Sequence, residues 1–233
     1  MVPVLILARN CLDLTRRCVE SIRKQDIETD ILLIDNGSSD GTKDWAAGEG
    51  IPVVFFEKNR GVSYGWNVGL DFLFMASHEY VLVVNNDTEL PPYFCRKLLS
   101  YGLPFVTGIS VDEPKDHPDC WSQPAESPDF SAFLIREDCW RKVGRFDEDM
   151  KFYASDNDYH VRAHRAGIRL VNSGTPFHHE RSSTLRLSIP KERAEIEAQA
   201  NEDRRTFRIK WGCMPWEPAY AELFKERVSD AKS

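Results

Sequence analysis

Short apolar runs alternate with amphipathic stretches along the first hundred residues. Four continuous apolar runs are typical of buried strands, at residues 2–8, 31–34, 53–56 and 80–84. Between them, apolar residues recur at helical spacing, as in the set Leu14, Cys18, Val19 and Ile22 and the set Val62, Trp66, Leu70 and Leu73. This alternation predicts βαβ units, and therefore an α/β domain with a mostly parallel sheet flanked by helices.

The second half of the chain continues the pattern less regularly. Strands are predicted at residues 130–135 and 168–171, and helices at 94–99, 136–143 and 156–166. The proline-rich, acidic stretch 112–129 predicts a loop, which we interpret as a lid over the site. From Pro190 the chain is polar and helix-prone to about Arg208, which predicts a C-terminal helical tail.

Polar residues follow three of the predicted strands. They form the clusters Ala8-Arg9-Asn10, Asp35-Asn36-Gly37 and Asn85-Asn86-Asp87. Ligands of open α/β sheets bind beyond the carboxyl ends of the strands, so the three clusters predict one common site.

Composition and charge narrow the kinds of ligand. The net charge of -7 and the pI of about 5.4 argue against a nucleic-acid partner. A phosphorylated ligand would therefore need a metal ion or backbone amides to neutralise it. The six cysteines are too few for a disulfide-stapled scaffold and are interpreted as reduced thiols. With no signal peptide and no run of about 18 apolar residues, we expect a cytoplasmic enzyme without a transmembrane segment.

Two acidic residues at strand ends are candidates for binding chemistry. Asp87 follows a strand beside carboxamides and could ligate Mg²⁺ or Mn²⁺, which prefer oxygen ligands. A simple turn is the alternative, because Asn and Asp are common turn residues. Asp35 could accept hydrogen bonds from a base or ribose, or it could form an Asx turn, and the sequence leaves both open.

Three further motifs are each open to a structural explanation. The Asn59-Arg60-Gly61 bend precedes a helix whose free amides would suit an anion. Asp156 opens a later helix, where it could act as a general base or simply favour the helix start. His178 and His179 point in different directions in an extended chain, so at most one should ligate a shared metal.

In their order and spacing, seven segments resemble the family-2 inverting glycosyltransferases of the GT-A fold, and within them the rhamnosyltransferase-like branch. The segments are VLILARN, LLIDNGSSDGT, NRGVSYGWNVGL, VLVVNNDTEL, GRFDEDMKFYASDNDYHVRAHRAGIRL, HHERSST and FRIKWG. The resemblance implies a single GT-A (Rossmann-like) domain over 1–212, followed by a tail over 190–233. Its nucleotide-binding half would be 1–100 and its acceptor-binding half 101–189.

The resemblance also implies roles for individual residues of the nucleotide-binding half. Ala8, Arg9 and Asn10 would line the base pocket, and Asp35 would bind the uracil or thymine ring or the ribose. The segment that covers the nucleotide and sugar would contribute the residues Asn59, Gly61 and Asn67.

The metal site and the base follow from the same resemblance. Asn85, Asn86 and Asp87 occupy the family's DxD motif, with Asp87 as the main ligand of Mn²⁺ or Mg²⁺. His178 or His179 would lie near the diphosphate and metal, and Asp156 would be the catalytic base. Separately from the resemblance, four aromatic residues of the second half are candidates for acceptor contacts, but they could equally be core residues: Trp121, Phe152, Tyr153 and Tyr159.

The implied reaction moves a sugar from a UDP- or dTDP-linked donor, with rhamnose favoured by the branch, to a hydroxyl of a glycan or other acceptor. Two departures from the family pattern, Asn85 in place of Asp and Ser155 in place of Glu, favour a non-catalytic nucleotide-sugar binding module as the alternative. A nucleotidyltransferase ranks lower, because the loop after the first strand, ARNCLDLTRR, has no glycine.

Overall fold

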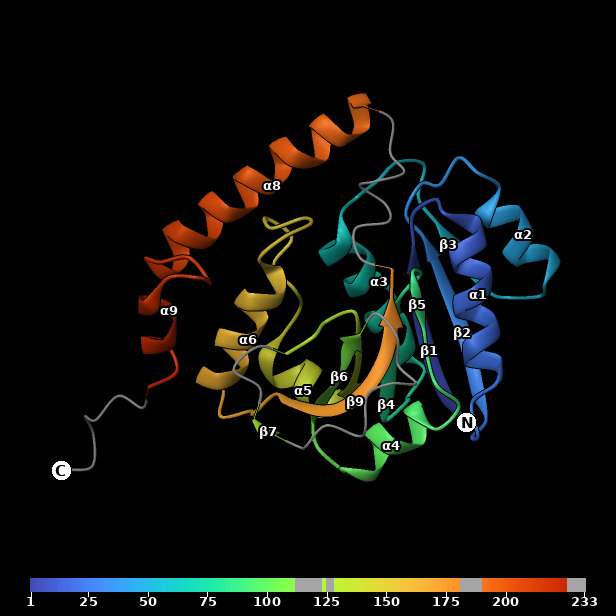
Figure 1. The fold of residues 1–233 in the computed structure, drawn as a ribbon, viewed down its shortest axis with the longest axis horizontal. Coiled ribbons are helices and arrows are strands. Elements are labelled where there is room, and N and C mark those ends of the chain that lie inside the picture. Colours follow the sequence, from blue (N-terminus) through green and yellow to red (C-terminus); the bar gives the residue numbers. More distant parts are fainter. Residues whose placement is uncertain (112–122, 125–127, 181–189, 226–233) are drawn as a thin grey trace.

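A computed structural model describes residues 1–111, 123–124, 128–180 and 190–225 (Figure 1). Within this described part the strands form a nine-stranded sheet of order β3-β2-β1-β4-β8-β6-β9-β5, and β7 pairs with β9 beside that path. The strands are β1 (Val2–Ala8), β2 (Thr29–Asp35), β3 (Val53–Phe55), β4 (Tyr80–Asn85), β5 (Thr88–Glu89), β6 (Phe105–Val111), β7 (Gln123–Pro124), β8 (Ala132–Arg136) and β9 (Val171–His179). The helices are α1 (Leu12–Arg23), α2 (Thr42–Gly48), α3 (Val62–Met75), α4 (Phe94–Ser100), α5 (Glu137–Val143), α6 (Ser155–Arg165), α8 (Pro190–Trp211) and α9 (Pro218–Glu222).

Strands β1 to β4 form a purely parallel unit, as predicted. β1 lies between β2 and β4, and β3 extends the sheet beyond β2. In register, Ala8 is opposite Asp35 on one side, and Leu7 is opposite Asn85 on the other. The carboxyl ends of these strands therefore meet at one edge, where the polar clusters lie.

The second half of the sheet is mixed. β8 runs antiparallel to both β4 and β6, and β5 and β7 run antiparallel to β9. The remaining strands share one direction, so the predicted α/β domain with a mostly parallel sheet is confirmed. One predicted strand is wrong: residues 168–170 are irregular, and the strand begins at Val171 and continues through His179. Ile168 and Leu170 are buried there without strand pairing, and an apolar run alone does not distinguish a paired strand from a buried irregular segment.

Alternate residues of the central strands serve two separate cores. Leu5 and Leu7 point into a core with α3, α5 and α6, whereas Val4 and Ile6 point into a core with α1, α2 and α4. Side chains of a strand alternate between faces, so a strand that is buried on both faces is apolar throughout. This explains why the strands of the first half read as continuous apolar runs.

Helix α3 approaches β1 closely because it carries glycines on the face that meets the sheet. A Cβ atom placed at Gly69 would lie 2.3 Å from Cδ1 of Leu5, which is fully buried. A glycine at this position therefore permits the close packing of α3 on β1, despite its cost in helix propensity.

Replacing Gly69 with alanine should destabilise the domain. We expect Gly69→Ala to lower the free energy of unfolding by about 1–3 kcal/mol through overpacking against Leu5. Gly48→Ala is the control, since a Cβ there meets nothing within 4 Å. It should be neutral or stabilising by up to about 1 kcal/mol. Denaturant unfolding of both variants measures the difference, and equal stability of the two would contradict the packing argument.

The C-terminal region contains the predicted helix, and this helix packs on the domain. α8 runs along the outer side of the molecule beside α6, and α9 follows it (Figure 1). A third apolar cluster joins Phe207 of α8 and Tyr220 of α9 to Met150, Ala154 and Val161. The predicted lid, residues 112–129, lies mostly outside the described residues. No helix in the described ranges is long and apolar enough to cross a membrane.

Candidate active site

The loops that follow β1, β2 and β4 are joined by hydrogen bonds. The Asn10 backbone N–H donates to Oγ of Ser38 over 2.8 Å, and Asn10 Oδ1 accepts from the Ser39 N–H over 2.8 Å. The side-chain amide of Asn86 donates to the Asn10 carbonyl over 3.0 Å. The three polar clusters therefore meet at one edge of the sheet, as predicted.

A fourth loop, before α3, is held by the loop after β2. Asn36 Nδ2 donates to the Gly61 carbonyl over 3.1 Å, and Asn36 Oδ1 accepts from the Arg60 N–H over 2.7 Å. Asn59 Oδ1 accepts from the Gly61 N–H over 3.0 Å. Gly61 has a φ of +94°, a value that residues with a side chain rarely adopt, and a Cβ placed on Gly61 would point at Lys151. Loop geometry, one of the two explanations left open for this motif, accounts for Gly61.

Asp35 is almost fully buried at the end of β2. Its Oδ1 accepts from the Ser38 N–H over 2.8 Å, which is the Asx turn considered as one alternative. Ala8, its neighbour in the sheet, has no exposed surface. Asp35 thus shapes the edge of the site.

One cavity, of about 650 Å³, lies above these loops and is closed on one side by α8. Arg9 and Asn59 line it from the sheet edge, Lys151 and Phe152 from a later loop, and Glu192 from α8. Arg9 forms an ion pair with Glu192, and both side chains are mostly buried. The Arg9 Nε atom is buried and has no hydrogen-bond partner among the described residues. A ligand with acceptor atoms would complete this cluster.

Asp87 and His179 face each other across the pairing of β5 with β9. His179 Nε2 lies 3.2 Å from Asp87 Oδ1, and both side chains are largely buried. His178 instead lies 3.7 Å from Glu180, so the two histidines have different partners, as expected in an extended strand. No group of three or more His, Cys, Asp or Glu residues in the described ranges could hold a metal alone.

A second cavity, of about 540 Å³, contains both a residue of the DxD-like segment and the candidate base. Asn85 lines it from the end of β4, and Asp156 from the first turn of α6. Trp66, Phe152 and Tyr153 form part of its wall. The indole Nε1 of Trp66 is buried and has no hydrogen-bond partner among the described residues. Asp87 is not among the residues that line this cavity; it follows Asn85 by two positions and faces His179.

The surroundings of Asp156 favour its protonated form. Burial raises the pKa of this carboxyl, and the negative charge of Asp129 raises the pKa further. The Asn157 N–H donates to Asp156 Oδ1 over 2.8 Å and partly opposes the increase. Ala154, whose φ of 63° lies in the left-handed region, forms the turn that places Asp156 in the first turn of α6. A carboxyl with a raised pKa in a cavity is typical of a group that accepts a proton during catalysis.

Three of the candidate residues have structural contacts instead. Asn67 is fully buried, and its amide is occupied by Phe146 and Glu148, so the predicted contact with a nucleotide does not fit this geometry. Asn86, also buried, uses its amide nitrogen to hold Asn10 and Thr15, so this nitrogen does not face a ligand. Tyr159 lies in the aromatic core rather than at an acceptor surface.

Three residues of the site were missed by sequence reasoning. Asp129 binds the N–H groups of Ser110 and Ser131 beside the cavity of Asp156. Lys151 and Glu192 line the cavity that contains Arg9. Each reaches the site through contacts distant in sequence, so no local motif marks it.

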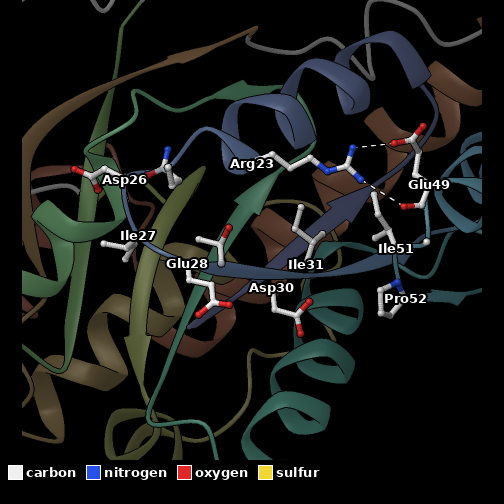
Figure 2. Close-up of a pocket in the computed structure, with 12 residues that line it drawn as sticks. Arg23, Asp26, Ile27, Glu28, Asp30, Ile31, Glu49, Ile51 and Pro52 are labelled. Atoms are coloured by element: carbon white, nitrogen blue, oxygen red, sulfur yellow. Dashed lines mark hydrogen bonds and ion pairs between the residues drawn. The ribbon is translucent and has the colours of Figure 1, made fainter.

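A further cavity lies at the opposite edge of the sheet. It measures about 590 Å³ and is lined by Arg23, Asp26, Glu28, Asp30 and Glu49 among others, with Arg23 bonded to Glu49 (Figure 2). It lies at the amino end of β2, whereas ligands of such sheets bind beyond the carboxyl ends. The two cavities at the carboxyl edge are therefore the better candidates.

Solved structures of other proteins share this fold. A mannosyltransferase from Pyrobaculum calidifontis, in complex with GDP-Man and Mn²⁺, has a TM-score of 0.63 and 17% identity, over 96% of this chain and 68% of that chain. S. aureus TarS 1-349 in complex with UDP-GlcNAc has a TM-score of 0.61 and 16% identity, over 96% of this chain and 70% of that chain. Glucosyl-3-phosphoglycerate synthase from Mycobacterium tuberculosis, in complex with Mn²⁺, UDP and glucosyl-3-phosphoglycerate, has a TM-score of 0.63 and 15% identity, over 91% of this chain and 80% of that chain. The class of fold is thus that of GT-A glycosyltransferases.

The family model of glycosyl transferase family 2 matches residues 4–169, which span β1 to the end of α6. The chain belongs to this family and is a glycosyltransferase. No curated protein sequence matches it.

Proposed function

We propose that this chain transfers a sugar from a nucleoside diphosphate sugar to an acceptor hydroxyl, with inversion at the anomeric carbon. The observation that carries the proposal is that Asn85, in the DxD-like segment, and Asp156, the candidate base, line one cavity. A donor held at the end of β4 would then present its anomeric carbon to an acceptor beside Asp156.

The larger cavity suits the nucleotide. Arg9 offers a cation whose Nε has no hydrogen-bond partner in the described part of the chain, and Asn59 adds polar atoms on the same wall. Ala8, Asn10 and Asp35 shape the sheet edge below it. The branch resemblance favours a UDP- or dTDP-linked donor, with rhamnose as the sugar, and a hydroxyl of a glycan or other acceptor. Within this scheme, residues 1–100 bind the donor and 101–189 the acceptor.

The pair Asp87 and His179 fits a divalent ion that the donor helps to hold. Mg²⁺ and Mn²⁺ usually take only one or two protein ligands and complete their coordination with phosphate oxygens and water. A carboxylate and an imidazole 3.2 Å apart are such a partial set. The bound ion would stabilise the negative charge of the departing nucleotide diphosphate.

Asp156 would take the proton of the acceptor hydroxyl. Its raised pKa makes it a stronger base than an exposed aspartate, and its cavity contains the aromatic side chains of Phe152 and Tyr153 for an acceptor. The Trp66 indole N–H can donate to a hydroxyl or a phosphate in the same cavity.

A thermal-shift panel tests the proposal. UDP-glucose, UDP-N-acetylglucosamine and dTDP-rhamnose are each added with Mn²⁺, since a ligand that binds only the folded chain raises its Tm. The donor that stabilises the chain is then assayed for nucleotide release. Stabilisation without release would favour a nucleotide-sugar binding module, for which Asn85 and Ser155 are the sequence features. A panel without any shift would contradict the donor site itself.

Neutralising Glu192 should strengthen the binding of nucleotide. Glu192→Gln removes the negative charge that pairs with Arg9, so that Arg9 can attract the diphosphate more strongly. We expect the affinity for UDP to rise about two- to tenfold at low salt and less at high salt. Glu197→Gln, an exposed change on the same helix, is the control and should have no effect. Calorimetric titration with UDP measures both variants; a weaker binding of UDP to Glu192→Gln would refute this role of Arg9.

A further inference from the structure

A fully buried carboxylate on the C-terminal helix holds the chain just before the candidate base. Asp203 of α8 accepts hydrogen bonds from the backbone N–H groups of Lys151 (3.1 Å), Phe152 (2.8 Å) and Tyr153 (3.0 Å). Gln199 Nε2, one turn earlier in α8, donates to the same carboxylate over 2.9 Å. A buried charge is costly unless hydrogen bonds compensate it, and here four N–H donors do so.

The opposite side of the same segment is held by the start of α3. The Lys151 carbonyl accepts from the Val62 N–H over 2.6 Å, and the Met150 carbonyl accepts from Ser63 Oγ over 2.6 Å. A Cβ at Gly61 would lie 2.8 Å from the Lys151 carbonyl oxygen, so this approach requires the glycine. The segment is therefore clamped by α3 through its carbonyls and by α8 through its amides.

This segment leads directly to the chemistry of the site. Phe152 and Tyr153 line the cavity that contains Asp156, and the left-handed turn at Ala154 follows them. A shift of the three amides held by Asp203 would move the first turn of α6, and with it Asp156.

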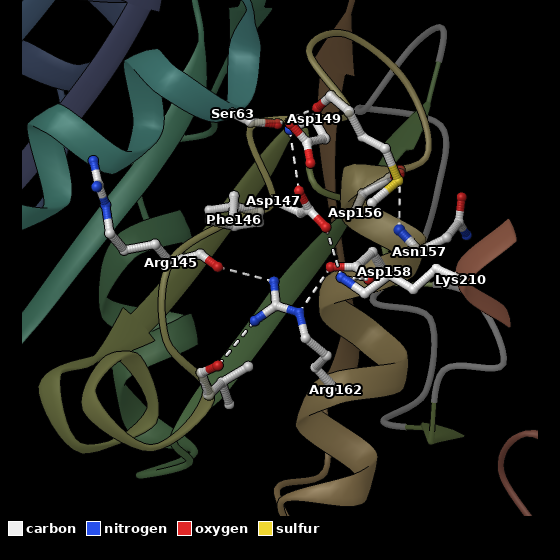
Figure 3. A network of polar contacts seen from close by, with 12 residues as sticks. Ser63, Arg145, Phe146, Asp147, Asp149, Asp156, Asn157, Asp158, Arg162 and Lys210 are labelled. Carbon is white, nitrogen blue, oxygen red and sulfur yellow. Dashed lines mark hydrogen bonds and ion pairs between the residues drawn. The ribbon is translucent and has the colours of Figure 1, made fainter. Parts of the chain in front are cut away.

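The C-terminal end of α8 is attached to α6 independently. Lys210 pairs with Asp147 over 2.6 Å and with Asp158 over 2.8 Å (Figure 3). Trp211 Nε1 also donates to Asp158, over 3.0 Å. Arg162 also binds Asp158, over 2.7 Å. Because of this second anchor, we expect α8 to stay docked when a single contact at its middle is removed, and a change at Asp203 to act locally.

We propose that Asp203 is a positioning residue for the transfer reaction: it fixes the backbone of residues 151–153 so that Asp156 and the aromatic wall of its cavity keep their working positions. The inference rests on the proposed function. Asp203 touches no ligand in this scheme and acts only through the segment it binds.

The test compares Asp203→Asn with Glu202→Gln, an exposed change of the same kind on the neighbouring residue. Asparagine has nearly the same shape but one acceptor oxygen fewer. For Asp203→Asn we expect amide hydrogen exchange in residues 151–153 to accelerate at least about tenfold, with unchanged protection in β1 and β4. The kcat for nucleotide release from the donor should fall about 10- to 100-fold, with the KM for donor within about twofold. Asp203→Ala should lower kcat further, and Glu202→Gln should match the wild type.

Each outcome decides a separate point. Unchanged exchange in residues 151–153 overturns the clamp, and faster exchange with unchanged kcat overturns the positioning role. A rise in donor KM equal to the fall in kcat would also overturn it, because the damage would then lie in donor binding. If the wild-type chain itself releases no nucleotide from any donor of the panel, the proposed function fails, and the positioning role fails with it. If Asp203→Ala does not fold, the isosteric Asp203→Asn still decides the question.

Discussion

Asp156→Asn is expected to lower turnover by about 10²–10⁴-fold while the affinity for UDP with Mn²⁺ stays within about twofold. The amide cannot accept the acceptor's proton, but it keeps the shape of the side chain and can still accept from the Asn157 N–H. Asp149→Asn is the matched control, because Asp149 is exposed on the preceding loop. Steady-state assays and calorimetry separate the two effects, and near-normal turnover of Asp156→Asn would remove Asp156 from its role.

The same variant should change the dependence of stability on pH. Burial, with a contribution from Asp129, raises the pKa of Asp156 in the folded chain above that of the unfolded chain, which is about 3.9. The unfolded chain therefore loses this proton first as pH rises, and the folded state is destabilised above that point. Asp156→Asn should then raise Tm at neutral pH, and the gain should vanish below about pH 4. A constant difference in Tm across this range would contradict the raised pKa.

The rate of the wild-type enzyme should follow the same titration. In the proposed role as base, Asp156 would act in its ionised form, so kcat should increase with pH through its raised pKa. Asp129→Asn removes a nearby negative charge and should shift this rise of kcat to lower pH. If the rise stays at the same pH in the variant, the charge of Asp129 does not affect Asp156.

The second large effect is expected for Asp87→Ala, which should lower the Mn²⁺-dependent affinity for UDP at least about tenfold. The carboxylate pairs with His179 at the edge of the sheet, and we expect it to supply the main protein ligand of the ion. Titrations of UDP in Mn²⁺ and in EDTA measure the difference. In EDTA the wild type and the variant should bind UDP equally.

The two histidines provide an internal control for this metal site. His179→Ala should weaken the Mn²⁺-dependent affinity, because His179 faces Asp87. His178→Ala should have a small effect, because His178 lies beside Glu180 instead. Equal losses for both variants would contradict the assignment of His179.

The parts of the fold that could be predicted from the sequence are those that local pattern encodes. β1, β2 and β4 are buried on both faces, so they appear as apolar runs, and parallel neighbours bring their polar ends together. The antiparallel insertion of β8 between β4 and β6 has no such local signal. Residues 168–170 show the limit clearly, because burial made an irregular segment look like a strand.

The candidate site residues divide in the same way, into those that local sequence marks and those that only contacts in space reveal. Asn85 and Asp156 belong to the first kind, because they lie at the end of β4 and in the first turn of α6, within recognisable segments. Asn67 and Asn86 are the same residue type as Asn85, and only their partners in space show that they serve the scaffold. Asp203 is about fifty residues from the amides it binds, so only the packing of α8 shows its role.

The family match ends at residue 169, but the packing of the molecule does not end there. The third apolar cluster needs Phe207 and Tyr220 to cover Met150 and Val161. A chain cut after the matched residues would expose this cluster to water and would release the amides that precede Asp156. The smallest catalytic unit of this enzyme should therefore be sought in a chain that extends through α9, rather than at the boundary that similarity alone draws.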